Sequence, residues 1–130
     1  MRQALPLLHQ QRYEAFQQLL GQVAQTIAQG DSALLYEPST VVQAKVADLQ
    51  QFFRQQILCL PLDILVPSMQ HWMQSYQVEC DKQLRLLGLD VMSLRAARQP
   101  TTIAQRQQQV SDRLSTLQRY CAAVLEGSRE

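Results

Sequence analysis

The chain of 130 residues contains few of the residues that build disulfide frameworks, metal sites or sheets. Aromatic residues make up 6%, and there are only four glycines and five prolines. The three cysteines, Cys59, Cys80 and Cys121, are an odd number without a Cys-x-x-Cys spacing, and the two histidines lie far apart. The sequence therefore predicts neither a disulfide framework nor a metal site. Each cysteine falls on or beside an apolar helical stripe, which predicts buried, reduced thiols.

Long apolar runs are also missing from the chain. No segment approaches about 18 consecutive apolar residues, so we expect no membrane span. The start, MRQALPLLHQQR, has too short an apolar run for a signal peptide, and Pro6 interrupts it. These features predict a cytoplasmic protein. The length predicts one domain over residues 1–130, large enough to fold without a metal or a disulfide.

Glutamine is the abundant residue, with 23 copies that nearly all fall in stretches of helical periodicity. Apolar residues recur every three or four positions in four stretches, which is typical of helices packed on helices. No segment alternates as a half-buried strand does, so we expect no sheet. The predicted fold is an all-α, antiparallel four-helix bundle with a long third helix. The predicted helices cover residues 6–29, 40–59, 68–98 and 102–125.

The ends of these helices follow from local signals. Ser68 is a candidate N-cap for the third helix, Pro100 ends that helix, and Thr101 or Thr102 caps the fourth. The apolar stretch LPLDILVP, residues 60–67, predicts a packed, extended linker across one end of the bundle. The connector over residues 31–39 is also apolar enough to pack down.

Two glycines lie inside predicted helices, where glycine costs stability. Gly21 in the first helix suggests a close contact with a neighbouring helix. Gly88 in the third suggests a bend or a tight crossing.

The net charge of +1 hides an uneven distribution. Residues 82–119 contain seven basic and two acidic residues, a local net of +5, whereas the rest of the chain carries −4. Several arginines flank the turn at Pro100, and a positive end of the bundle could receive an acidic peptide. The alternative is that Arg95 and Arg98 simply complement the negative end of a helix dipole. The candidate partner-binding residues are Arg95, Arg98, Arg106 and Arg113.

We find no catalytic constellation in the sequence. The closest carboxylates, Glu79 and Asp81, are two residues apart and point to different faces of a helix. There is no glycine-rich phosphate loop and no defensible Ser-His-Asp order. The sequence therefore predicts a protein that is not an enzyme and holds no cofactor. Nucleic acid is not an expected partner either, because the chain has no aromatic stacking platform and a pI of only 7.7.

The C-terminal half of the third helix is apolar around much of its girth, and this pattern has more than one explanation. Several neighbouring helices could cover it, or one face could be kept for a partner, including a second copy of the chain in a homodimer. Trp72, with Met69 and Met73, could form core packing or a partner groove. The partner-groove interpretation predicts an alternative function. The chain would then be a helical assembly chaperone or adaptor that holds an apolar peptide near Trp72, Tyr76 and Leu86.

Two stretches resemble a known family. The run QLRLLGLDVMSLRAARQPTTIAQRQQQVSDRLSTLQRYCAAVL is similar to the C-terminal half of PatD, the heterocyst frequency control proteins of cyanobacteria. LQQFFRQQI is similar to the second helix of that family, and the likeness extends from about Val42 to Leu125. The resemblance implies a small cytoplasmic regulator that limits how many cells become heterocysts, and that is linked to cell division through assembly of the tubulin-like protein FtsZ. The family supplies no binding-residue motif to carry over. In an organism without heterocysts, the resemblance would imply the cell-division role alone.

Overall fold

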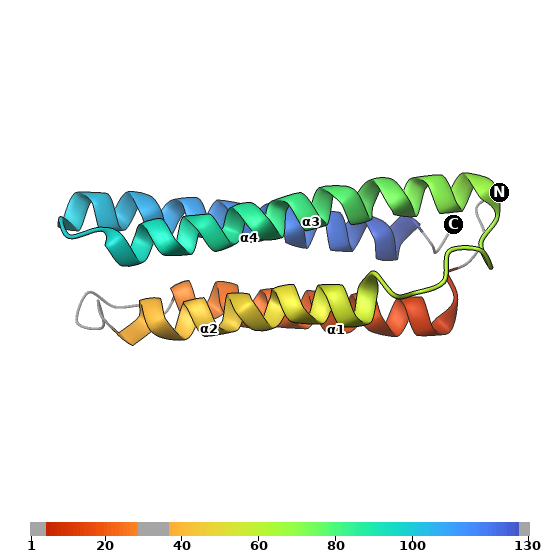
Figure 1. The fold of residues 1–130 in the computed structure, drawn as a ribbon, viewed down its shortest axis with the longest axis horizontal. Coiled ribbons are helices and arrows are strands. Elements are labelled where there is room, and N and C mark those ends of the chain that lie inside the picture. The colour runs from red at the N-terminus through yellow and green to blue at the C-terminus, as the bar shows by residue number, and fades with distance from the viewer. Residues whose placement is uncertain (1–4, 29–36, 128–130) are drawn as a thin grey trace.

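A computed structural model describes residues 5–28 and 37–127 and, except for residues 37–40, their side chains. This part of the chain forms four α-helices and no strand. The helices alternate in direction, with α1 and α2 in one layer and α3 and α4 in the other (Figure 1). The prediction of an all-α, antiparallel four-helix bundle is confirmed. The elements are α1 (Leu7–Ala28), α2 (Glu37–Phe52), the π-helical turn η2 (Phe53–Ile57), α3 (Pro67–Ala96) and α4 (Pro100–Gly127).

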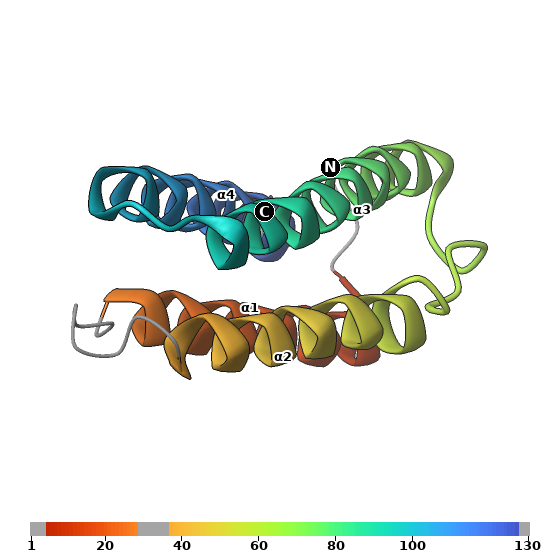
Figure 2. The same cartoon turned by 60° about the vertical axis from the view of Figure 1, so that its left-hand side comes forward.

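The core lies between the two layers, which Figure 2 shows from the side. Helix α1 packs against α2 and α4, and α3 packs against α4 and α2, so the four helices enclose one apolar interior. Each helix contributes the residues of its apolar stripe, which burial removes from water. Rings of Phe16, Phe52 and Phe53 meet at one point of the α1–α2 layer, with centroids 6.1 Å and 5.7 Å from Phe16. The α3 part of the core consists of Met69, Met73, Cys80, Leu84, Leu87, Val91 and Leu94.

Two prolines begin helices, where the sequence patterns placed serine or threonine caps. Helix α3 starts at Pro67, after Val66 as its N-cap, and no side chain caps it. Helix α4 starts at Pro100, and the amide of Ile103 donates to the carbonyl oxygen of Gln99 at 2.9 Å. Proline fits the first helical position because its missing N–H would have no partner there. The Ser68 cap and the Thr101 or Thr102 cap were therefore wrong.

The second helix ends in a π-helical turn instead of continuing as an α-helix to residue 59. The amide of Leu58 donates to the carbonyl oxygen of Phe53 at 2.9 Å, which closes a turn one residue wider than an α-turn. Arg12 of α1 donates to the carbonyl oxygen of Gln56 at 2.9 Å. This contact satisfies one of the carbonyl groups near the end of the helix.

The stretch predicted as an extended linker, residues 60–67, forms a chain of turns. The amide of Leu65 donates to the carbonyl oxygen of Leu62 at 3.0 Å. Leu60 and Leu65 are buried, so the stretch is packed as expected, but it is not extended. His9 of α1 holds it in place, since its Nε2 lies 2.8 Å from the carbonyl oxygen of Pro61 and must donate to it. Part of the other expected connector, residues 31–39, is helical, because α2 begins at Glu37 and not at residue 40 as predicted. Residues 31–36 of that connector and the predicted end of the first helix at residue 29 lie outside the described residues.

The two interior glycines differ in their surroundings. A Cβ atom added to Gly21 would meet nothing within 4 Å, so the expected close helix contact at this position is wrong. A Cβ atom on Gly88 would lie 2.9 Å from Nε2 of Gln50 on α2. The end of the Gln50 side chain therefore occupies the space that a side chain at position 88 would need.

Candidate partner-binding surface

The structure divides the four candidate arginines into two groups. Arg95, Arg98 and Arg106 surround the α3–α4 turn, where Arg95 and Arg98 are exposed and Arg106 is half-buried. Arg113 lies farther along α4 and turns toward α3. Its Nε donates to Oδ2 of Asp90 at 2.9 Å, and its Nη1 donates to Oε1 of Gln83 at 3.1 Å. The charge of Arg113 is therefore neutralised inside the bundle, and we leave it out of the proposed surface.

Among the side chains that the structure describes, the three turn arginines contact uncharged acceptors. Arg98 donates to the carbonyl oxygen of Arg95 at 3.2 Å, which is the contact expected of a cation at a helix C-terminus. Arg106 donates to Oε1 of Gln109 at 3.0 Å. Arg95 donates to Oε1 of Gln43 on α2. None of the three guanidinium groups has a carboxylate partner in the part of the chain that the structure describes, so their charge remains available to a partner.

A groove of about 450 Å³ runs between α2 and α3, and one of its lining residues, Gln43, accepts the bond from Arg95. Two small residues, Ala47 of α2 and Gly88 of α3, are among the residues that line it. Gln50 crosses the floor and donates from Nε2 to the carbonyl oxygen of Leu84 at 3.0 Å. The groove is lined by Gln43, Val46, Ala47, Gln50, Arg85, Gly88, Leu89, Val91 and Met92. The sequence patterns did not predict it, because its small residues are far apart in the chain.

Two large apolar residues of this groove, Leu89 and Met92, are exposed. Leu89 is 59% exposed and Met92 is 61% exposed. A smaller hollow of about 80 Å³ adjoins the groove and shares Gln50 and Arg85 with it. Arg54 of α2 lines this second hollow. The α2–α3 side thus combines exposed apolar side chains with cations.

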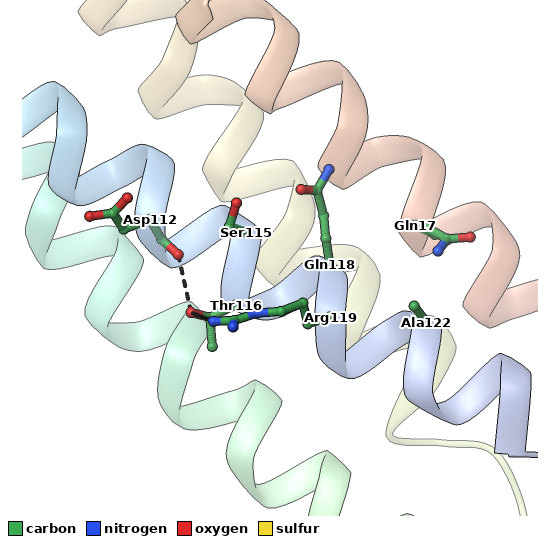
Figure 3. A pocket seen from close by; sticks show the side chains of 7 residues that line it. All are labelled: Gln17, Asp112, Ser115, Thr116, Gln118, Arg119 and Ala122. Atoms are coloured by element: carbon green, nitrogen blue, oxygen red, sulfur yellow. Dashed lines mark hydrogen bonds between the residues drawn. The ribbon is translucent and has the colours of Figure 1, made fainter.

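A second large hollow, of about 710 Å³, lies on the outer face of α4 beside α1 (Figure 3). Its polar groups bond to one another along the helix. Thr116 donates to the carbonyl oxygen of Asp112 at 3.1 Å, and Arg119 donates to Oγ1 of Thr116 at 3.2 Å. All its lining residues except Gln17 come from α4 alone, so the hollow is an open helix face.

The residues expected to line an apolar peptide groove, Trp72, Tyr76 and Leu86, are each half-buried. The Trp72 and Tyr76 rings pack edge to face with centroids 5.1 Å apart, and Tyr76 packs on Tyr120 of α4 at 6.0 Å. Helix α4 therefore covers part of this aromatic cluster. The large exposed apolar residues of α3 are Val78, Leu89 and Met92.

The cysteines also separate by environment. Cys80 and Cys121 are buried, and burial raises the pKa of each thiol to about 12. The thiol of Cys121 donates to the carbonyl oxygen of Tyr13 at 3.1 Å. Cys59 is exposed and donates to the carbonyl oxygen of Gln55 at 2.9 Å. The prediction of a buried thiol is thus wrong for Cys59, which follows the π-helical turn and faces solvent.

No group of three His, Cys, Asp or Glu side chains within residues 5–28 and 41–127 is placed to hold a metal ion. No helix in the described part of the chain is long and apolar enough to cross a membrane. Comparisons with protein-family models, with curated proteins and with solved structures found no match. The resemblance to PatD therefore stays a prediction.

Proposed function

We propose that the chain is a non-enzymatic, cytoplasmic regulator of the PatD kind, which acts by contact with another protein and changes the assembly of FtsZ. One observation supports this proposal above the others. Arg95, Arg98 and Arg106 cluster at one end of the bundle with only uncharged partners. A cluster of unneutralised cations favours and orients an acidic partner surface. In a filamentous organism, the consequence would be a lower frequency of heterocysts.

FtsZ assembly is the experiment that tests this proposal. Purified FtsZ is polymerised with GTP, with and without a stoichiometric amount of the chain, and followed by light scattering and sedimentation. We expect the chain to change the amount or the bundling of polymer, and to do so less as the salt concentration rises. Polymer that is unchanged in both assays at every salt concentration would refute the role in FtsZ assembly.

Charge reversal tests the assignment of the surface. A variant with Arg95→Glu, Arg98→Glu and Arg106→Glu should lose most of the effect on FtsZ, because an acidic partner would now meet like charges. The matched control is Arg119→Glu, which reverses one exposed charge on the α1–α4 side of the molecule. If the triple variant acts on FtsZ as the unmodified chain does, the turn arginines are not the contact.

A second candidate is the adaptor that holds an apolar peptide. The exposure of Leu89 and Met92 favours it, because large exposed apolar residues beside a groove mark binding surfaces. Salt separates the two candidates. Binding that depends on apolar contact alone does not weaken between low and moderate salt, whereas binding to unneutralised arginines does.

A further inference from the structure

We propose that the α2–α3 groove binds an amphipathic helix of a partner protein, with acidic residues bracketing a short apolar stripe. This inference rests on the proposed function, because it states which kind of partner segment is recognised. The groove is linked to the turn arginines through Arg95, whose donor contact with the lining residue Gln43 places it at one end of the groove.

The apolar surface of the groove lies in its middle. Leu89 and Met92 are three residues apart on α3, so they lie on neighbouring turns of the same helix face. Both are more than half exposed beside a hollow of about 450 Å³. At the floor, the amide of Gln50 lies over Gly88 and gives a partner helix a polar contact between the apolar side chains. A partner helix that lays apolar side chains into such a groove is a recurrent mode of recognition.

The charged part lies at the two ends. Arg85 precedes Leu89 by four residues and Arg95 follows Met92 by three, and they are separated by about 15 Å of helix at 1.5 Å per residue. Arg54 of α2 stands with Arg85 at the same end and has no ion pair in the described part of the chain. The carboxylate in the adjoining hollow is Asp81, 3.4 Å from Arg85. Arg54 and Arg85 together outweigh Asp81 at one end, and Arg95 stands at the other, so the groove is positive at both ends and apolar between them.

A second copy of the chain suits this groove poorly. The usual two-fold dimer places the same patch of both subunits together. Here that arrangement brings the arginines of one copy toward those of the other, with Asp81 as the carboxylate available nearby. A helix with acidic residues at the spacing of the arginines complements the groove in charge and in apolarity.

The test uses a synthetic helical peptide and the full-length chain. The peptide, about 18 residues long to span the groove, carries two glutamates at the spacing of Arg85 and Arg95 and two leucines between them. Its fluorescence anisotropy is measured against increasing concentrations of the chain at low salt. Two control peptides replace the glutamates by lysines or the leucines by glutamines. We expect each control peptide to bind at least about tenfold more weakly than the test peptide.

Variants of the chain locate the site. The double variant Leu89→Gln, Met92→Gln should weaken peptide binding about tenfold or more. The matched control is Val78→Gln, which changes an equally exposed apolar residue of the same helix, 66% exposed and outside the groove lining. A further variant, Arg85→Gln with Arg95→Gln, should weaken binding and reduce its salt dependence. Every substituted position is exposed, so these variants should fold.

Three results would overturn the inference. The test peptide could bind the Leu89→Gln, Met92→Gln variant as tightly as the unmodified chain, or bind neither. The lysine peptide could bind as well as the glutamate peptide. Sedimentation could show a dimer of the chain that this double variant abolishes, which would make a second copy the occupant.

If the chain changes FtsZ assembly and the double variant does so equally, the groove fails while the proposed function stands. If the peptide binds the groove but FtsZ assembly is unaffected, the groove is confirmed as a helix-binding site and the proposed function fails.

Discussion

Helix α3 meets its two neighbours in different ways. Against α4, long side chains close the interface: Arg113 bonds to Asp90 and Gln83, and the Tyr76 ring packs on Tyr120. Against α2, Gln50 crosses between the helices to the carbonyl oxygen of Leu84, and a groove remains beside it. Both sides share the same buried stripe of α3. The residues beside that stripe decide whether an interface is sealed or left available to a partner.

The largest expected difference in stability is between substitutions at two positions of α3 that are five residues apart. Leu87 is completely buried, so Leu87→Ala should lower the free energy of unfolding by about 2–5 kcal/mol through lost burial and a cavity. Met92 faces the groove, and Met92→Ala should cost less than about 0.5 kcal/mol. Urea unfolding followed by circular dichroism measures both. A similar loss for the two variants would mean that the groove is closed in solution.

The second contrast compares the two ion pairs of α3. Asp90 and Arg113 are only 16% and 28% exposed, so Asp90→Ala leaves a half-buried guanidinium without its carboxylate. We expect it to cost about 1–3 kcal/mol. The Asp81–Arg85 pair lies within one exposed helix face, and Asp81→Ala should cost about 0–1 kcal/mol. Thermal unfolding at neutral pH compares the stability of the two variants. An equal loss of stability would contradict a closed interface between α3 and α4.

The third contrast uses the two helical glycines. Gly21→Ala adds a methyl group in open space and should stabilise the chain by up to about 1 kcal/mol, because alanine is the better helix former. Gly88→Ala forces the end of the Gln50 side chain to move and breaks its bond to Leu84, so most of that gain should be lost. Comparing the two melting temperatures tests this. An equal rise would show that Gln50 moves aside at little cost and that its bond to Leu84 contributes little to stability.

The smallest expected effect concerns the thiols. Cys59→Ser should change stability by less than about 0.5 kcal/mol, because Cys59 is exposed. The same substitution should abolish rapid labelling by a thiol reagent at pH 8. Cys80 and Cys121 should react only after unfolding, since they are buried and their raised pKa values, about 12, leave almost no thiolate. Mass spectrometry counts the labels, and rapid labelling of the serine variant would contradict the packing.

The fold was largely predictable from the sequence, because a buried helix face must repeat every three or four residues. The binding surface was predictable only in part. The positions of Arg95, Arg98 and Arg106 around the turn follow from Pro100, which begins α4. The pairing of Arg113 with Asp90 cannot be predicted from the sequence, because it depends on the register of α3 against α4. The groove likewise depends on the register of α2 against Gly88 of α3, and no single stretch of sequence contains that information.

The most direct test of the account uses methionine methyl groups as probes. Met92 lies at the groove, whereas Met69 and Met73 are buried in the same helix and serve as internal controls. The chain is labelled with ¹³C at its methionine methyl groups and titrated with FtsZ at low salt. If the groove is the contact, the Met92 resonance shifts or broadens while those of Met69 and Met73 stay in place. An unchanged Met92 resonance, in a sample where the chain alters FtsZ assembly, would contradict it.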